Sequence, residues 1–258
     1  MSFPNYPGKH NNRSVLTAQD IVNYRSKLGR LPNVGKIEGV LLCLQKGLPE
    51  RRRVRWRNPY RRAGKLMGDL YLMKKSLGKT AVLTNFGIGA PLVASLVEEL
   101  IALGAKRLVS MSWVGGLQPE LRPADIVVCN RAIRDEGVSH HYLPPSKYVE
   151  ANPELVQELI STLESRGLAC SAGTTWTTDA PYRETEAEIR QYQAEGVKTV
   201  EMESAALFAV GQRRGVQTAS VLVVGDSLAE LRWQAPSDVG PIERALEAVY
   251  AAALAVLG

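Results

Sequence analysis

The sequence predicts a single α/β domain of three layers, α/β/α, built on a central mixed, mostly parallel sheet. Runs typical of strands alternate along the chain with segments of helical periodicity. Several strand-like runs are almost continuously apolar, as expected of strands that helices cover on both faces. The chain has 258 residues, 45% of them hydrophobic, which suffices for one large domain or two small ones. Without an internal repeat or a low-complexity linker, we predict one domain over 36–258 and an N-terminal segment, 1–35, whose structure is the least determined.

Seven apolar runs predict strands, at 39–44, 81–85, 107–114, 125–129, 168–175, 197–200 and 218–225. A 3.6-residue period predicts a helix over 92–101, which Gly104 ends. Asn152 and Pro153 begin another helix, which extends toward Gly167, and apolar positions from 242 to 257 predict the last one. A further helical pattern starts directly after Glu203.

Composition excludes several classes of protein. The sequence has no apolar run of 18 residues, so we expect no membrane-spanning segment. Residues 1–12 are polar and lack the apolar centre of a secretory signal. Cys43, Cys129 and Cys170 lie in apolar runs without metal-ligand spacing, and they are typical of buried thiols in a reducing compartment. The predicted location is the cytoplasm.

The net charge of +6 is concentrated in one stretch between residues 51 and 65. It contains two aromatic and eight basic residues: Trp56, Tyr60, Arg51, Arg52, Arg53, Arg55, Arg57, Arg61, Arg62 and Lys65. Three interpretations are open: a solvated or interface loop, a small-anion site completed at a subunit interface, or a nucleic-acid patch. No nucleic-acid-binding motif accompanies the stretch, so we predict no nucleic-acid partner.

The triplet Glu201-Met202-Glu203 lies where a predicted strand meets a predicted helix. Ligands of α/β proteins usually bind at such junctions. A carboxylate accepts two hydrogen bonds at once, which suits adjacent sugar hydroxyls, and methionine offers a soft apolar surface to a ring. The alternative is that Glu203 only complements the positive end of the following helix.

Asp226 and a glycine loop follow two other predicted strands. Burial at the end of an apolar strand raises the pKa of a carboxyl, which suits a general acid, although Asp226 with Ser227 would also form a helix N-cap. Gly87 and Gly89 lie between a strand and a helix, where backbone amides can approach a ligand. The alternative for these glycines is a tight turn.

Four motifs occur in the order and with the spacing of a known family: Gly115-Gly116-Leu117-Gln118-Pro119, Arg134-Asp135-Glu136-Gly137, Glu201-Met202-Glu203-Ser204-Ala205-Ala206 and Gly225-Asp226. Over residues 36–227 the chain resembles the purine nucleoside and uridine phosphorylase superfamily, which also contains nucleosidases. The resemblance implies a phosphorylase/hydrolase-like fold. It also implies cleavage of the N-glycosidic bond of a purine or uridine-type nucleoside by phosphate, giving free base and ribose-1-phosphate. The alternatives are a nucleosidase that uses water and a non-catalytic nucleoside-binding protein.

The resemblance assigns roles by position. Glu201, Met202 and Glu203 match the family's ribose-binding residues, and Asp226 matches the aspartate that protonates or hydrogen-bonds the purine N7. Gly87, Gly89 and Gly115 match its glycine elements. Phosphate is expected as a co-substrate, with no other cofactor, and the family's dimers and hexamers imply a homo-oligomer.

The chain departs from the family at the phosphate and base sites. Ser110 stands where phosphorylases have a phosphate-binding arginine, and the stretch 44–51 lacks their Asp-Pro pair. Pro181 replaces the phenylalanine that stacks on the base, so Trp113 and Trp176 are the candidates for an aromatic wall, and Arg183 for a donor to a base carbonyl. The two tryptophans are equally compatible with the core.

Histidines suggest two further expectations. Adjacent His140 and His141 lack a third ligand at metal-binding spacing, so no metal site is predicted. His10 is a candidate contact from a neighbouring subunit to the ribose 5′ end.

Overall fold

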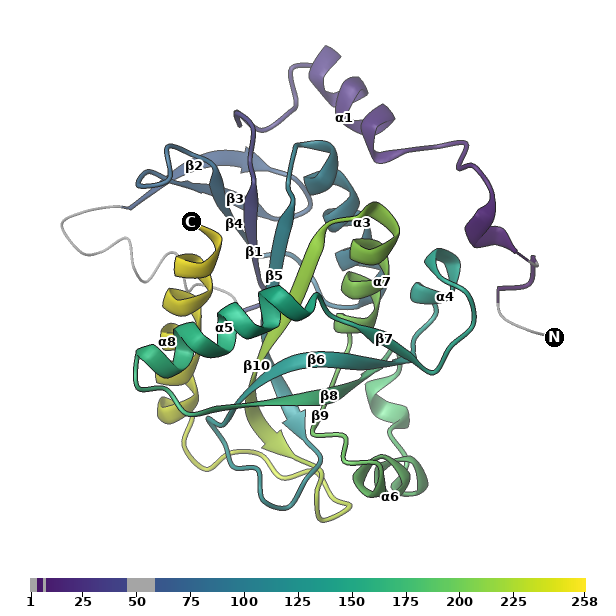
Figure 1. Cartoon of the computed structure of the whole chain (residues 1–258), viewed down its shortest axis with the longest axis vertical. Coiled ribbons are helices and arrows are strands. Elements are labelled where there is room, and N and C mark those ends of the chain that lie inside the picture. The colour runs from purple at the N-terminus through teal and green to yellow at the C-terminus, as the bar shows by residue number, and fades with distance from the viewer. Residues whose placement is uncertain (1–3, 7, 46–58) are drawn as a thin grey trace.

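The computed structural model describes residues 4–6, 8–45 and 59–258. Its centre is a ten-stranded mixed sheet with helices on both sides (Figure 1). The strands in chain order are β1 (Gly39–Cys43), β2 (Tyr60–Lys65), β3 (Asp69–Met73), β4 (Thr80–Thr84), β5 (Arg107–Gly116), β6 (Ile126–Asp135), β7 (Tyr148–Glu150), β8 (Cys170–Thr178), β9 (Thr199–Glu201) and β10 (Gln217–Ser227).

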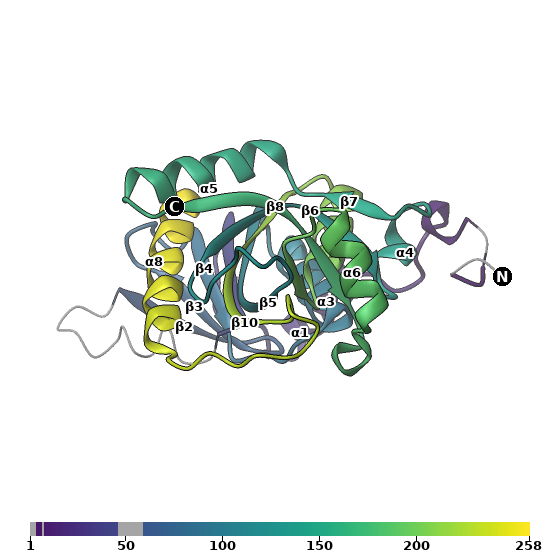
Figure 2. The ribbon, with the colours of Figure 1, turned by 90° about the horizontal axis from the view of Figure 1, so that it is seen from below.

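Part of the sheet closes on itself. The order β10-β6-β8-β9-β5-β1-β4-β3-β2 contains an additional pairing between β10 and β5. Five strands therefore form a closed ring, which surrounds the centre of the view in Figure 2. Parallel pairs join β1, β4, β5 and β10, while β2, β3 and β4 form an antiparallel meander. The mixed sheet is as predicted, and parallel and antiparallel pairings are equally frequent among the described strands.

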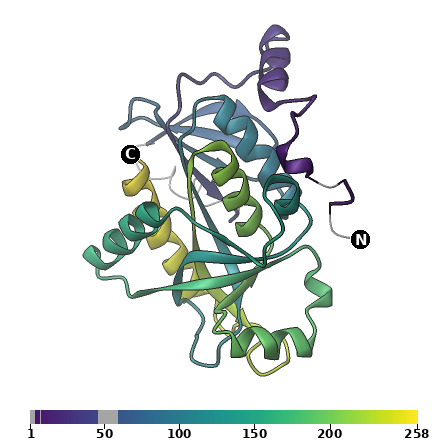
Figure 3. The ribbon, with the colours of Figure 1, turned by 45° about the vertical axis from the view of Figure 1, so that its right-hand side comes forward.

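The helices form the outer layers. They are α1 (Ala18–Lys27), α3 (Ala90–Ala102), α4 (Ser139–Tyr142), α5 (Pro153–Ser165), α6 (Glu186–Ala194), α7 (Ser204–Arg214) and α8 (Gly240–Leu257), with short turns η1 (Lys9–Asn11) and η3 (Pro181–Arg183). Helices α5 and α8 pack together on one side of the sheet, and α3 and α7 pack on the other (Figures 1 and 3). Because helices cover both faces, every residue of β1 and β4 is buried.

Two hydrophobic cores stabilise this arrangement. The larger one joins the sheet to the helices on both faces. The smaller one lies between α6 and the ring of strands and consists of Leu117, Ile133, Trp176, Ile189, Tyr192, Val197 and Val200. Trp176 is at its centre, and its ring lies 4.8 Å from that of Tyr192, centroid to centroid.

Strands β2, β3 and β7 and helices α1, α4 and α6 were not predicted by hydrophobic periodicity. Strand β2 has the polar sequence Tyr-Arg-Arg-Ala-Gly-Lys and lies at the edge of the sheet, where it pairs only with β3 among the described strands. Helices α1 and α6 bury few residues and begin instead with capping boxes, Thr17 with Asp20 and Thr185 with Glu188.

Most of the basic stretch, 51–57, lies outside the described residues. Of its remaining members, Arg61 donates to the carbonyl of Asn33 at 3.0 Å, and Arg62 pairs with Asp69 at 2.6 Å. The Asp69 contact raises the pKa of Arg62, so this pair is a structural contact of β2 with β3.

Three further findings concern only the described part of the chain. No helix there is both long and apolar enough to cross a bilayer. No group of three metal-ligating side chains is found. The side chains of Cys43 and Cys129 are buried and that of Cys170 is partly so, and no disulfide joins any of the three.

Candidate active site

Strand ends bring the predicted site residues together. Gly115, near the end of β5, is the register partner of Asp226 in β10 and of Val200 in β9. Glu201 ends β9 directly after Val200. The structure therefore places the triplet and Asp226 on either side of one glycine. A Cβ on Gly115 would lie 2.9 Å from the Leu228 side chain and 3.0 Å from the Val200 side chain, so a larger residue would have to displace them.

Glu201 has a structural role. Its Oε2 accepts the amides of Glu203 at 2.8 Å and Ser204 at 2.7 Å, and its Oε1 accepts the Thr177 hydroxyl at 2.5 Å. These bonds satisfy amides that the N-terminus of α7 would otherwise leave unpaired. Glu201, two residues before Glu203, therefore supplies the side-chain acceptor for the N-terminal amides of α7.

The side chain of Glu203 is directed toward the glycine loop. It occupies the N-cap position of α7 without a capping bond, and its Oε1 accepts the Gly89 amide at 2.6 Å. Gly89 has φ 102° and precedes α3, so the glycine loop and the triplet meet at the N-termini of two helices. Met202, partly buried, lies between the two glutamates in the chain.

Burial raises the pKa of both glutamates. Glu203 is 4% exposed, and burial followed by the charge of Glu201 raises its pKa to about 7, although the Gly89 amide opposes the shift. Burial also raises the pKa of Glu201, against the donors that stabilise its charge. Two buried carboxyls with like charges disfavour each other's ionisation, which is the second cause of the raised pKa of Glu203.

Asp226 lies between two indoles. Its Oδ1 accepts the Trp113 Nε1–H at 3.1 Å, and its Oδ2 accepts the Trp233 Nε1–H at 2.7 Å. Strand β10 continues through Ser227, so no helix begins at Asp226 and the N-cap alternative is wrong. Trp233 was not anticipated, because it is a lone aromatic residue in a polar loop. A two-way backbone bridge between Ser227 and Gln234 brings it back to Asp226.

Gly225 allows the Trp113 contact. The register of β10 against β5 shifts between Val224 and Asp226, which is a β-bulge at this glycine. A Cβ there would lie 1.4 Å from Trp113 Nε1, so the indole rests directly against the backbone. The Gly-Asp motif therefore includes the glycine for steric reasons.

Glu184 is a second titratable group near Asp226. Burial, then the negative charges of Asp226 and Glu188, raise its pKa to about 7. Nothing in its local sequence distinguishes it.

The three residues predicted to contact the base lie in different environments. Trp176 is 1% exposed and donates its indole N–H to Asp135 at 2.9 Å, so it offers no free face to a base. Arg183 in η3 is exposed, and within the described residues its side chain makes no hydrogen bond. Trp113 is partly buried and faces Asp226.

Arg134 and Glu136 of the Arg134 motif stabilise a loop. The Arg134 guanidinium is buried and donates to Ser139 Oγ and to the carbonyls of Leu143 and Pro144. Glu136 accepts the amides of Val138 and Ser139. The motif thus stabilises the turn that carries the two adjacent histidines.

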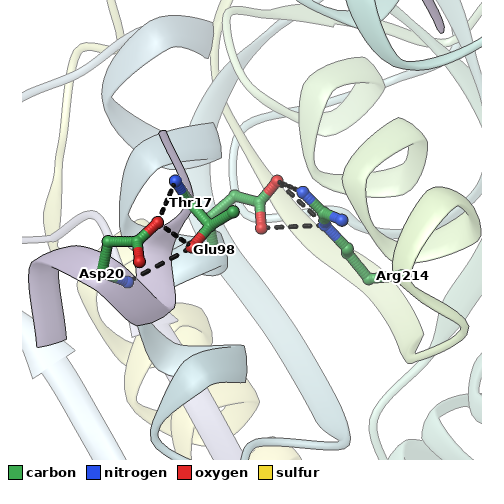
Figure 4. A network of polar contacts seen from close by, with 4 residues as sticks. All are labelled: Thr17, Asp20, Glu98 and Arg214. Carbon is green, nitrogen blue, oxygen red and sulfur yellow. Dashed lines mark hydrogen bonds and ion pairs between the residues drawn. The ribbon is translucent and has the colours of Figure 1, made fainter. Parts of the chain in front are cut away.

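A separate cavity of about 650 Å³ lies between the N-terminal segment and helices α3, α4 and α7. Its lining includes His10 and His141, as well as Glu98 and Arg214, which form a bidentate ion pair (Figure 4). Figure 4 also shows the Thr17–Asp20 capping contacts beside this pair. Glu98 and Arg214 lie far along α3 and α7 from Gly89 and Glu203, so the cavity is distinct from the candidate site.

Comparison with known proteins agrees with this arrangement. Residues 54–257 match the model of the phosphorylase superfamily. The chain belongs to this superfamily.

Its relatives act on different nucleosides. A uridine phosphorylase of Haemophilus influenzae is 27% identical over 197 residues, covering 70% of this chain and 77% of the relative. A DeoD-type purine nucleoside phosphorylase of Bacillus cytotoxicus is 29% identical over 153 residues, covering 58% of this chain and 65% of the relative, slightly under two thirds. A solved uridine phosphorylase from Vibrio fischeri superposes with a TM-score of 0.70 at 24% identity, over 87% of this chain and 91% of that one. This likeness confirms the three-layer fold.

The structure shows the environment of Ser110, one of the residues at which the chain departs from the family pattern. Ser110, at the place of the phosphate-binding arginine, is 2% exposed, and its hydroxyl lies 2.7 Å from that of Ser220. Ser204 donates to the same Ser220 hydroxyl at 3.0 Å. Ser110 therefore belongs to a buried hydroxyl chain that links α7 to β5 and β10.

Proposed function

We propose that the protein is a nucleoside phosphorylase that cleaves the N-glycosidic bond with phosphate, giving free base and ribose-1-phosphate. The observation that carries the proposal is the position of Glu203. A buried carboxyl, oriented by the Gly89 amide and one residue from Met202, has the chemistry to bind the ribose hydroxyls. Membership of the phosphorylase superfamily supports this chemistry.

Bond cleavage places positive charge on the ribose and negative charge on the base. The negative charge of Glu203 favours an oxocarbenium-like transition state. Asp226 lies across Gly115 from the triplet, on the side where we place the base. An acidic group there favours a purine, whose N7 accepts a proton, while the exposed Arg183 supports uridine as the alternative base.

The decisive experiment is a nucleoside panel with and without phosphate. Inosine, adenosine and uridine are incubated with the protein, and ribose-1-phosphate is measured separately from free ribose. We expect ribose-1-phosphate, formed only when phosphate is present. A rate that does not change when phosphate is removed would contradict the proposal.

A nucleosidase that uses water is the second candidate, and Ser110 favours it. Serine cannot replace the charge of a phosphate-binding arginine, and this serine is buried. Free ribose as the product would establish the hydrolase. Nucleoside binding by calorimetry without either product would establish the third alternative, a non-catalytic binding protein.

We also propose that the protein is a homo-oligomer. The N-terminal segment exposes large apolar side chains, namely Tyr6, Val15, Leu16, Tyr24 and Leu28. Such a concentration is typical of a surface that another subunit covers. Light scattering after gel filtration measures the mass, for which we expect a dimer or hexamer of the 28.2 kDa chain.

A further inference from the structure

Trp233 contacts the carboxyl that we place on the base side of the candidate site. Its Nε1–H donates to Asp226 Oδ2 at 2.7 Å. A Cβ on Gly115 would lie 3.8 Å from the same Oδ2 and 3.0 Å from the side chain of Val200, the residue directly before the triplet. The oxygen that Trp233 contacts therefore lies beside Gly115, next to the strand that leads into the triplet.

Backbone hydrogen bonds fix the turn that carries this indole. Ser227 and Gln234, on either side of the turn, exchange two backbone hydrogen bonds, at 3.1 and 2.8 Å. The amide of Leu228 donates to the carbonyl of Gly116 at 2.9 Å. Trp233 directly precedes the bridged Gln234, so its ring extends from an anchored position of the backbone.

Most of the Trp233 side chain is nevertheless open to solvent, with 68% of it exposed. An indole has a single polar atom, Nε1, which is already bonded to Asp226, so the exposed remainder is apolar. A tryptophan with a bonded N–H and a free apolar face is typical of a binding surface. The arrangement points to a planar partner for this face.

The other tryptophans that the structure describes lack such a face. Trp176 is 1% exposed, so a base cannot stack on it. Trp113 is partly buried, and its pyrrole ring rests against the backbone of Gly225. Pro181 stands where the family has its stacking phenylalanine. Among the described tryptophans, Trp233 is therefore the one that offers a largely open ring at the site.

The hydrogen bond to Asp226 determines how close a bound base comes to the indole. A group that hydrogen-bonds to Oδ2 lies about 3 Å from that oxygen. Trp233 Nε1 lies 2.7 Å from the same oxygen, so the group is within about 6 Å of the indole nitrogen. Aromatic rings pair with their centroids about 4.5–7 Å apart. A base that bonds to Asp226 is thus within stacking distance of Trp233.

We propose that Trp233 forms an aromatic wall of the base site and makes the protein prefer a purine to a pyrimidine. This proposal rests on the proposed function, in which the base of the nucleoside reaches Asp226. A bicyclic purine overlaps the two-ring indole more completely than the single ring of uracil does, so stacking contributes more to purine binding. The indole has two separable roles, because its N–H orients the carboxyl and its face binds the base.

Two substitutions separate the ring from its N–H. Trp233→Gln keeps an amide donor for Asp226 but removes the aromatic face, whereas Trp233→Phe keeps an aromatic face and removes the donor. Calorimetry measures the Kd of each variant for two free bases, hypoxanthine and uracil. We expect Trp233→Gln to raise the Kd for hypoxanthine by about tenfold or more, and that for uracil by less. Trp233→Phe should stay within a few-fold of the wild type.

Glu230→Ala is the matched control, because Glu230 is an exposed residue of the same turn. Both of its Kd values should stay within about twofold of the wild type. Equal affinities of the wild type and Trp233→Gln for hypoxanthine would overturn the proposal. So would equal losses in the Gln and Phe variants, which would assign the effect to the hydrogen bond, or equal losses for the two bases. A lower oligomer mass of Trp233→Gln with unchanged affinity would make the ring a subunit contact instead.

Kinetics with inosine separates this proposal from the proposed function. If the wild type cleaves no nucleoside but binds hypoxanthine in a manner that depends on Trp233, the proposed function fails and the role of Trp233 is retained. If the wild type forms ribose-1-phosphate and Trp233→Gln has the same kcat/KM and Kd, the function is retained and the role of Trp233 fails. A wild type that binds no hypoxanthine, by calorimetry or as an inhibitor of cleavage, would also overturn the proposal.

Discussion

The Gly89 amide donates a 2.6 Å hydrogen bond to Oε1 of Glu203 and so joins the N-terminus of α3 to that of α7. Both helices direct their positive ends toward this carboxyl. The bond fixes the orientation of a side chain that is 4% exposed. The bond brings the glycine loop to the triplet, and strand register places Gly115 beside Val200, directly before the triplet.

The first prediction concerns the negative charge of Glu203. Glu203→Gln keeps an acceptor for the Gly89 amide but removes the negative charge, so we expect the fold to persist and kcat/KM for a nucleoside to fall by about 100-fold. Steady-state kinetics and thermal melting measure the two effects. The control is Glu99→Gln, a buried carboxyl on α3 that pairs with Arg25. Its kcat/KM should stay within about twofold of the wild type, and equal losses in both variants would contradict the assignment.

The pH dependence of stability is the second prediction. In the folded protein the pKa of Glu203 is raised from 4.5 to about 7, so folding favours the protonated form. Its contribution to stability is complete below pH 4.5 and is lost as the pH rises toward 7, by about 1–3 kcal/mol. Urea denaturation of the wild type and Glu203→Gln at pH 5 and pH 7.5 measures this term. The wild type should lose more stability than the variant between the two values, and parallel losses would show that Glu203 does not titrate in this range.

The third prediction concerns the contact between Trp113 and Gly225. A methyl group at residue 225 would overlap the indole, so Gly225→Ala must displace Trp113 and release Asp226 Oδ1. We expect a loss of stability of about 1–3 kcal/mol and a lower turnover number. Gly35→Ala is the control, because a Cβ there meets no atom within 4 Å. Indole fluorescence and denaturant unfolding distinguish the variants, and an unchanged Gly225→Ala protein would contradict the packing.

The fourth prediction concerns the buried position of Ser110. Ser110→Ala removes one member of the hydroxyl chain through Ser220 and should destabilise the fold by about 1 kcal/mol. Since the Ser110 hydroxyl is buried against Ser220, we expect the KM for phosphate to be unchanged. Kinetics at varied phosphate concentration test this expectation. A several-fold rise in that KM would place Ser110 at the anion site after all.

Sequence periodicity predicted the buried strands well, because β1, β4, β5 and β10 are covered on both faces and read as apolar runs. It could not predict β2 or α1. Strand β2 is polar and exists through its backbone pairing with β3, and α1 begins with a side-chain capping box and buries only Val22 among its residues. Trp176 illustrates the same limit, since a tryptophan near a site motif and a tryptophan in the core look alike in the sequence.

The sequence by itself determined the family, the three-layer fold and the candidate residues Glu201, Met202, Glu203 and Asp226, because these depend on local pattern and on motif order. Only the tertiary structure decided which contacts each of these residues makes. Glu201 caps α7 and Glu203 is turned toward Gly89, because strand register and helix packing determine which donors each carboxyl meets. Trp233 reaches Asp226 from elsewhere in the chain for the same reason. Proximity between distant residues is a property of packing, and no local pattern encodes it.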